Sequence, residues 1–195
     1  MKRLAALMIA LTLCAPAVFA QNHGEIGAFV DWTRLRHANN TNFFGLGGRV
    51  GFNASENVQF EAQMAYDFEQ SFTNTGSVSS GFNSTTNLSR TSLRMLHGLF
   101  GPKIQTGGGA VRLFATVQGG FLKFSVSNPN TATTTAFSNS VNIFQGDTNG
   151  VLYPGGGIEF YAGPIGLRVD VGDEIYFDRG ANHNLKFMFG PQFRF

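Results

Sequence analysis

The chain has 195 residues, of which 25 are Gly and 21 are Phe, and only 13% are charged. Its formal net charge is +2, and without Lys2 and Arg3 the basic count falls to the 12 of the acidic residues. This balance argues against a nucleic-acid partner, which requires a basic surface. The single cysteine, Cys14, excludes a disulfide framework, and the length suits one domain.

Residues 1–20 have the pattern of a secretory signal peptide. A basic start is followed by the apolar segment Leu4–Leu13 and by a small-residue cleavage site that ends at Ala20. The apolar segment is too short to span a bilayer as a helix, which needs about 20 residues. Cys14 leaves a lipoprotein signal open, although the large residue before it disfavours that alternative. We expect a mature domain of residues 21–195 that lacks a thiol nucleophile.

The C-terminal segment alternates between apolar side chains and polar or small ones. Its odd-numbered positions hold Leu185, Phe187, Phe189, Pro191, Phe193 and Phe195. A period of two indicates a strand with one buried face, because successive side chains leave opposite faces. A strand that turns aromatic side chains to lipid and polar ones to a lumen is what a transmembrane β-barrel requires. An edge strand of a soluble sandwich is the alternative.

Similar alternation recurs along the chain and is clearest over residues 58–68. Around residues 92–104 and 151–161 the facing is uncertain, and for the first of them we prefer Leu96, Gly98, Phe100 and Ile104 outward. Asp173 falls on the apolar face of its strand, so we expect a bulge near Gly172. The predicted strands cover residues 24–35, 44–52, 58–68, 92–104, 110–124, 151–161, 167–177 and 185–195. This even number predicts an all-β fold, an eight-stranded antiparallel up-and-down transmembrane β-barrel.

The connections alternate in length. We expect short turns at residues 53–57, 106–109 and 162–164, medium connections at 36–42 and 178–184, and long loops at 70–90 and 125–150. Short periplasmic turns and longer external loops are the arrangement of outer-membrane barrels. The long loops are rich in Ser, Thr and Asn, which suits mobile segments that recognise a surface ligand.

The same parity sends most charged side chains of the strands inward. An eight-stranded barrel is just wide enough for side chains to fill it, so charges of both signs could pair there as a plug. Arg or Lys turned to lipid would instead cost about 2–4 kcal/mol near mid-bilayer. Arg34 and Lys123 break the parity near strand ends, where this cost is small. The predicted lumen network comprises Glu25, Asp31, Arg49, Glu61, Asp67, Arg112, Glu159, Arg168, Asp170, Glu174, Lys186 and Arg194.

Taken together, the signal peptide, the eight strands, the Gly-rich segments at 45–51 and 155–160 and the terminal Phe-Arg-Phe resemble the outer membrane protein β-barrel family. That family includes OmpA-like and opacity-type small barrels. The resemblance implies a monomer in the outer membrane of a Gram-negative-type bacterium, in contact with lipid, with a structural, adhesion or envelope-integrity role. It also implies an assembly signal for the barrel-assembly machinery, formed by Leu185, Phe187, Phe189, Phe193 and Phe195. Since the chain ends with the barrel, we expect no cell-wall tether.

Other functions are less well supported. Some small barrels resemble lipid A acylases, deacylases or omptin-type proteases, which use His with Ser or acidic partners near the outer rim. Here His37 and His183 fall in expected loops and His97 falls mid-strand, without metal-ligand spacing inside one element. The Gly-rich segments lack a nucleotide fingerprint. We therefore expect no enzyme, cofactor or metal. A small-solute pore, a lipid-modifying enzyme and a soluble lipocalin-like binder remain the alternatives.

Overall fold

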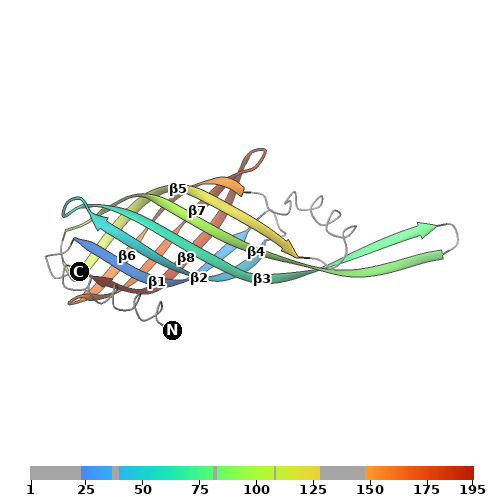
Figure 1. Cartoon of the computed structure of the whole chain (residues 1–195), viewed down its shortest axis with the longest axis horizontal. Coiled ribbons are helices and arrows are strands. Elements are labelled where there is room, and N and C mark those ends of the chain that lie inside the picture. Colours follow the sequence, from blue (N-terminus) through green and yellow to red (C-terminus); the bar gives the residue numbers. More distant parts are fainter. Residues whose placement is uncertain (1–22, 37–39, 81–82, 108, 128–147) are drawn as a thin grey trace, which may run out of the picture.

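The computed structural model describes residues 23–36, 40–80, 83–107, 109–127 and 148–195. Each strand pairs antiparallel with the next, and the last pairs with the first, so that the sheet closes into a barrel (Figure 1). The predicted fold class is confirmed. The strands are β1 (Gly24–Leu35), β2 (Thr41–Asn53), β3 (Val58–Ser80), β4 (Asn83–Gln105), β5 (Val111–Ser127), β6 (Thr148–Ala162), β7 (Ile165–Phe177) and β8 (Ala181–Arg194).

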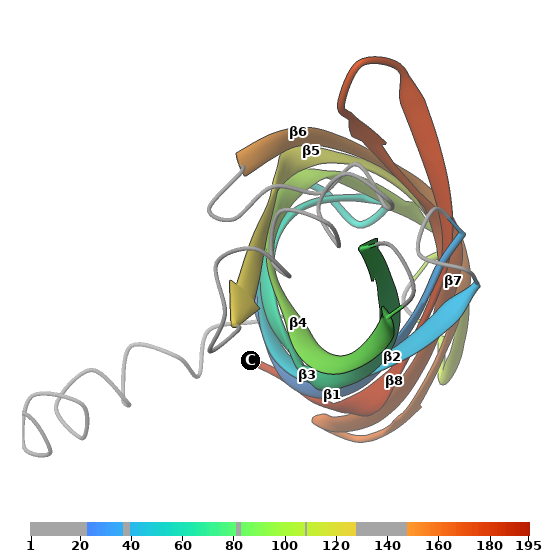
Figure 2. The same cartoon turned by 90° about the vertical axis from the view of Figure 1, so that its right-hand side faces the viewer.

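Figure 2 looks along the barrel and shows the ring of strands around its interior. No helix within the described ranges is long and apolar enough to cross a membrane. The signal-peptide prediction for residues 1–20 lies outside the described part of the chain.

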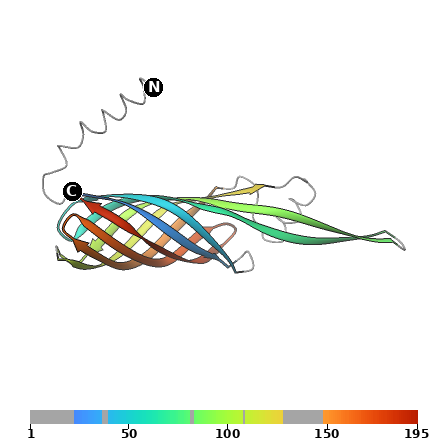
Figure 3. The same cartoon turned by 90° about the horizontal axis from the view of Figure 1, so that it is seen from below.

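The barrel closes between its first and last strands. Gly24 and Phe195 exchange two backbone hydrogen bonds, each with an N–O distance of 3.0 Å. The ladder continues to Arg34, which lies opposite Leu185. Closure removes the edges of the sheet, as a sheet in hydrocarbon requires because its backbone groups have no water to bind. The C-terminus lies at the end of the barrel opposite the projecting β3–β4 hairpin (Figure 3).

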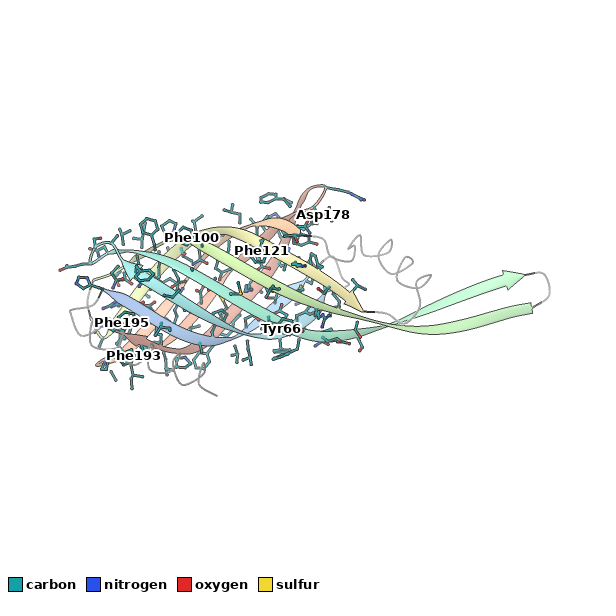
Figure 4. All side chains as sticks on the ribbon, viewed as in Figure 1. Tyr66, Phe100, Phe121, Asp178, Phe193 and Phe195 are labelled. Atoms are coloured by element: carbon teal, nitrogen blue, oxygen red, sulfur yellow. The ribbon has the colours of Figure 1, made fainter. Side chains whose placement is uncertain are left out.

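The outer wall of the barrel is apolar. Every strand exposes large hydrophobic side chains, and Figure 4 shows Tyr66, Phe100 and Phe193 on the wall. On β4, Phe100 and Ile104 are 60% and 62% exposed, which is the facing preferred from the sequence. The Phe100 ring stacks on that of Phe60 with centroids 6.3 Å apart. Such a surface is the reverse of a water-soluble one, in which large apolar side chains face a core.

Residues 70–80 pair with residues 83–93 as the two strands of a β-hairpin, so the prediction of a loop at 70–90 is wrong. β3 and β4 run past the barrel and stay paired from Gln70 opposite Leu93 to Ser80 opposite Asn83. The hairpin projects far beyond the other strands (Figure 1). Its sequence is polar at most positions, so no apolar alternation marked it as strand. The barrel strands below it template the pairing, since each added residue continues an existing ladder.

The predicted bulge near Gly172 is also wrong. β7 pairs with β8 in one continuous register from Ile165 to Phe177. The polar Asp173 is accommodated on the outer side, where its carboxylate lies 2.5 Å from Nδ1 of His183. The irregularity lies instead in β3, where the register with β4 shifts between Asp67 and Gln70.

The two medium connections and the long 125–150 connection are shorter than expected, because flanking strands extend into them. β2 begins at Thr41, and β8 begins at Ala181 after a turn in which Arg179 and Gly180 have φ values of 51° and 153°. β5 extends to Ser127 and β6 starts at Thr148. The rest of the predicted 125–150 loop lies outside the described residues.

Candidate functional site

The interior of the barrel is the most distinctive part of the molecule, because it encloses many charges. The strands direct these side chains inward by their alternation. Each predicted lumen residue except Arg194 is at most 6% exposed. Arg194 is half-buried at the C-terminal end, where its guanidinium lies 4.7 Å from the centre of the Tyr161 ring. The buried members are Glu25, Asp31, Arg49, Glu61, Asp67, Arg112, Glu159, Arg168, Asp170, Glu174 and Lys186.

A first cluster lies toward the end of the barrel where the chain terminates. Lys103 Nζ is 2.6 Å from Glu159 Oε1 and 3.2 Å from Glu25 Oε2. Arg112 approaches the other oxygen of Glu25 at 3.4 Å, and the Tyr161 hydroxyl donates to that same oxygen at 2.8 Å. Both oxygens of the Glu25 carboxylate are therefore matched with donors, as a buried charge requires.

A second cluster is centred on Arg168. Its guanidinium holds both oxygens of Glu61, at 2.5 and 3.2 Å, and Asp170 at 2.7 Å. A longer ion pair of 3.5 Å to Glu159 links it to the first cluster. The Tyr153 hydroxyl donates to Asp170 at 2.8 Å. The bidentate contact with Glu61 fixes the relative orientation of the guanidinium and the carboxylate and also neutralises their charges.

Amides and aromatic rings complete the surroundings of this cluster. Gln118 donates to Glu61 at 3.0 Å and accepts from Gln63 at 2.8 Å. The Arg168 guanidinium lies over the Phe114 ring at 4.0 Å from its centre. Ring faces attract cations, so Phe114 is compatible with the charges around it.

A third cluster is built around His97. Its Nε2 lies 2.8 Å from Asp67 Oδ2 and its Nδ1 lies 2.9 Å from Glu174 Oε2. Lys186 Nζ approaches the same Glu174 oxygen at 3.0 Å and Asp31 Oδ2 at 2.8 Å. These five groups come from five different strands and join them across the interior.

Within each of the three clusters, the positive and negative charges neutralise one another. Removing one partner of a buried ion pair typically costs about 3–5 kcal/mol, because the other charge is left without a counter-charge. Packing around them is tight: the gap bounded by Phe29, Gln63, His97, Leu99 and Met188 has no room for a water molecule. Chemically, the three clusters are sets of fixed charges in which each member contacts at least one group of opposite charge.

Toward the hairpin end, the interior becomes apolar. Phe124 and Tyr176 meet edge to face, with ring centroids 5.6 Å apart. This layer was missed by the sequence reasoning, which expected polar side chains throughout the lumen. Its fully or almost fully buried members are Leu35, Phe43, Leu93, Met95, Leu122, Phe124, Val126, Val151 and Tyr176.

The predicted assembly-signal residues occupy the outer side of β8. Leu185, Phe187, Phe189 and Phe193 are 40–43% exposed on the wall. The Phe195 ring instead covers Gly24, where an added Cβ would come within 2.7 Å of it. The terminal residue therefore joins the seam of the barrel by its backbone and its side chain.

The barrel is similar to several solved structures of outer-membrane proteins. Neisserial surface protein A has 10% sequence identity and a TM-score of 0.53, over 88% of this chain and 97% of that one. OprG from Pseudomonas aeruginosa has 12% identity and a TM-score of 0.52, over 89% and 96% of the two chains. The fold is that of the small outer-membrane β-barrels. Ail, the attachment invasion locus protein of Yersinia pestis, gives 13% identity and a TM-score of 0.50, over 89% and 97%.

At these identities the likeness is one of fold. No protein-family model matches the sequence, and no curated protein matches it either. The resemblance that the alternating strands and the terminal Phe-Arg-Phe suggested is thus confirmed at the level of the small outer-membrane barrel fold.

Several interior residues were not identified from the sequence. Lys103 is fully buried and contacts two carboxylates, and His97, whose facing was uncertain, is 1% exposed. A signal for both did exist. With Phe100 and Ile104 outward, the alternation of β4 necessarily places positions 97 and 103 inward.

Proposed function

We propose that this protein is a monomeric outer-membrane barrel that acts as a plugged, non-catalytic anchor and presents the β3–β4 hairpin outside the cell. The observation that carries the proposal is the inverted burial of the barrel. Outer-wall residues such as Val117 and Met64 are more than half exposed, whereas Arg168 and Glu61 are at most 1% exposed. Apolar side chains are stable toward lipid, and charges are stable when enclosed with partners.

Two features support a plugged interior: the three ion-pair clusters, and the apolar layer that lies between them and the hairpin end of the barrel. Steady conductance would require Arg168 and its partners to separate and the layer at Phe124 to open. We expect no steady large-conductance steps when the purified protein is inserted into a planar bilayer. Such steps, at a frequency that scales with the amount of protein added, would favour the small-solute pore.

The surface role rests on the hairpin of residues 70–90. It lies at the end of the barrel opposite the C-terminus, which is periplasmic in this arrangement (Figure 3). One protein of similar fold, Ail, is an attachment protein by name. We infer an adhesion or envelope-integrity role for this chain, exerted through the hairpin and the segment 125–150.

The test is a deletion of residues 72–90, with the two barrel strands joined by a two-residue turn. The truncated barrel should fold and keep its unheated electrophoretic mobility. If the hairpin carries recognition, attachment of cells that express the variant to host or abiotic surfaces should fall to the level of cells without the protein. Undiminished attachment would refute the role of the hairpin.

Lipid is the partner that the outer wall fits. Arg34, Arg94 and Lys123 are exposed on the wall, each in the part of its strand nearer the hairpin end. Arg94 and Lys123 are diagonal neighbours on β4 and β5, since Arg94 lies opposite Ser125. We propose that they meet lipid phosphates. Replacing both with Gln should lower the phosphorylated lipid retained in native mass spectra, whereas replacing His23 at the opposite end should not. Equal retention would contradict the assignment.

A further inference from the structure

Two buried carboxylates in the His97 cluster face each other across a glycine. Asp31 and Asp67 lie directly opposite Gly45, one on each neighbouring strand. A Cβ at Gly45 would overlap Oδ1 of both aspartates, so both oxygens converge over this one residue. Asp31 and Asp67 are 2% and 0% exposed.

The two oxygens of each aspartate have different surroundings. Asp31 Oδ2 lies beside Lys186 and Asp67 Oδ2 beside His97. The Oδ1 atom of each lacks a hydrogen-bond donor among the described residues, so the only relief that these side chains offer is a proton shared between the two carboxyl groups. Two like charges that converge in a buried place repel each other, and an unpaired carboxylate oxygen is costly there. A metal cation between the two Oδ1 atoms would remove both costs and replace that shared proton.

His97 lies beside the same two aspartates, with its Nε2 2.8 Å from Asp67 Oδ2. One ligand atom from each of Asp31, Asp67 and His97 can be chosen so that all three lie within 4.8 Å of one another. The second ring nitrogen of His97 contacts Glu174 at 2.9 Å. In metal sites a ligand histidine commonly donates its other N–H to a carboxylate, which fixes the tautomer and the orientation of the ring.

We propose that Asp31, Asp67 and His97 form a binding site for one divalent transition-metal ion, with Glu174 and Lys186 as positioning residues. The donor set determines the class of ion. Imidazole nitrogen with carboxylate oxygen suits zinc and its first-row neighbours, whereas magnesium and calcium prefer oxygen ligands alone. Metal binding requires His97 Nε2 to give up the proton that faces Asp67. The three carboxylates and Lys186 then leave two negative charges, which a divalent ion balances. Bound there, the ion would tie β1, β3 and β4 together inside the barrel.

The experiment uses zinc as the probe and loads it while the full mature chain refolds in detergent, because the site is enclosed. After removal of free metal, elemental analysis should find about one zinc per folded chain. Asp31→Asn and His97→Gln should each retain less than about a tenth of that amount. Glu174→Gln should weaken zinc binding by about 10–100-fold.

His183→Gln is the matched control, since His183 also contacts an aspartate but lies on the outer wall, where its side chain is 51% exposed. It should keep the full zinc content. Full zinc retention by a folded His97→Gln or Asp31→Asn variant would overturn the proposal, and so would a folded wild type without zinc. If the interior variants fail to fold, the zinc X-ray absorption spectrum of the wild type decides. Imidazole and carboxylate ligands are expected, and a spectrum without imidazole would refute the site.

Discussion

Arg168→Met tests whether the buried ion pairs stabilise the barrel. Methionine fills much of the volume of arginine but leaves Glu61 and Asp170 without their closest cation, and Glu159 without one of two. The guanidinium now contacts these three carboxylates at distances of 2.5 to 3.5 Å. Breaking a buried pair from one side typically costs about 3–5 kcal/mol. We expect a loss of that size in the free energy of unfolding.

The assay is urea-dependent unfolding and refolding in lipid vesicles, followed by the fluorescence of Trp32, the only tryptophan of the chain. Trp32 lies on the outer side of β1, so its emission reports contact with lipid. The matched control is Arg36→Met, because Arg36 is exposed just beyond the end of β1. This variant should change the free energy of unfolding by about 0.5 kcal/mol or less.

The double variant Glu61→Gln with Arg168→Met separates charge from packing. Removing the negative charge as well should restore part of the lost stability, with a coupling energy of roughly 0.5–3 kcal/mol. A loss for Arg168→Met no larger than that for Arg36→Met would refute the reasoning. It would mean that water or other groups already solvate the carboxylates around Arg168.

Three further experiments test the outer wall, the strand packing and the C-terminal residue. Met64 lies near the middle of β3 on the outer side, so Met64→Arg should lower the free energy of unfolding in vesicles by about 2–4 kcal/mol. Phe68 lies nearer the rim, so Phe68→Arg should cost only about 0–1 kcal/mol. Equal costs would contradict the depth assignment. Gly120→Ala would place a Cβ against the Gly98 carbonyl, so it should lower the free energy of unfolding by about 1–3 kcal/mol in the same urea titration. The neighbouring Gly119→Ala is the control and should be tolerated, because the nearest atom to its added Cβ is 3.9 Å away. Deletion of Phe195 should reduce the amount of barrel assembled in cells. Refolding in detergent, judged by the unheated electrophoretic mobility, should stay largely intact. If cellular assembly and refolding are both lost, this residue serves folding rather than recognition by the assembly machinery.

The barrel was predictable because its strands obey one simple rule. Lipid outside and paired charges inside force a period of two, which β3 shows without exception from Val58 to Asp67. The alternation disappears where inward-facing and outward-facing residues are of the same chemical type. Leu35 and Phe43 are apolar although they face inward, and the hairpin is mostly polar. Alternation therefore located most strands but neither the apolar layer of the interior nor the length of β3 and β4.

Pairing inside the barrel was beyond sequence reasoning for a different reason. Lys103 meets Glu159 across a separation of 56 residues, and His97 meets Glu174 across 77. Parity indicates which side chains enter the lumen, but the partner of each depends on the tilt and register of all the strands between them. The convergence of Asp31 and Asp67 over Gly45 likewise arises only after three strands are in register.

The measurement that tests the central claim most directly is the electrophoretic mobility of the protein in the outer-membrane fraction, heated against unheated. The account predicts that the protein is found in this fraction and that the unheated band is shifted, because a closed barrel with an apolar wall resists detergent until heated. A protein recovered from the soluble periplasm, with the same mobility before and after heating, would contradict it. That result would favour a lipocalin-like binder and would require the inward and outward assignments to be reversed.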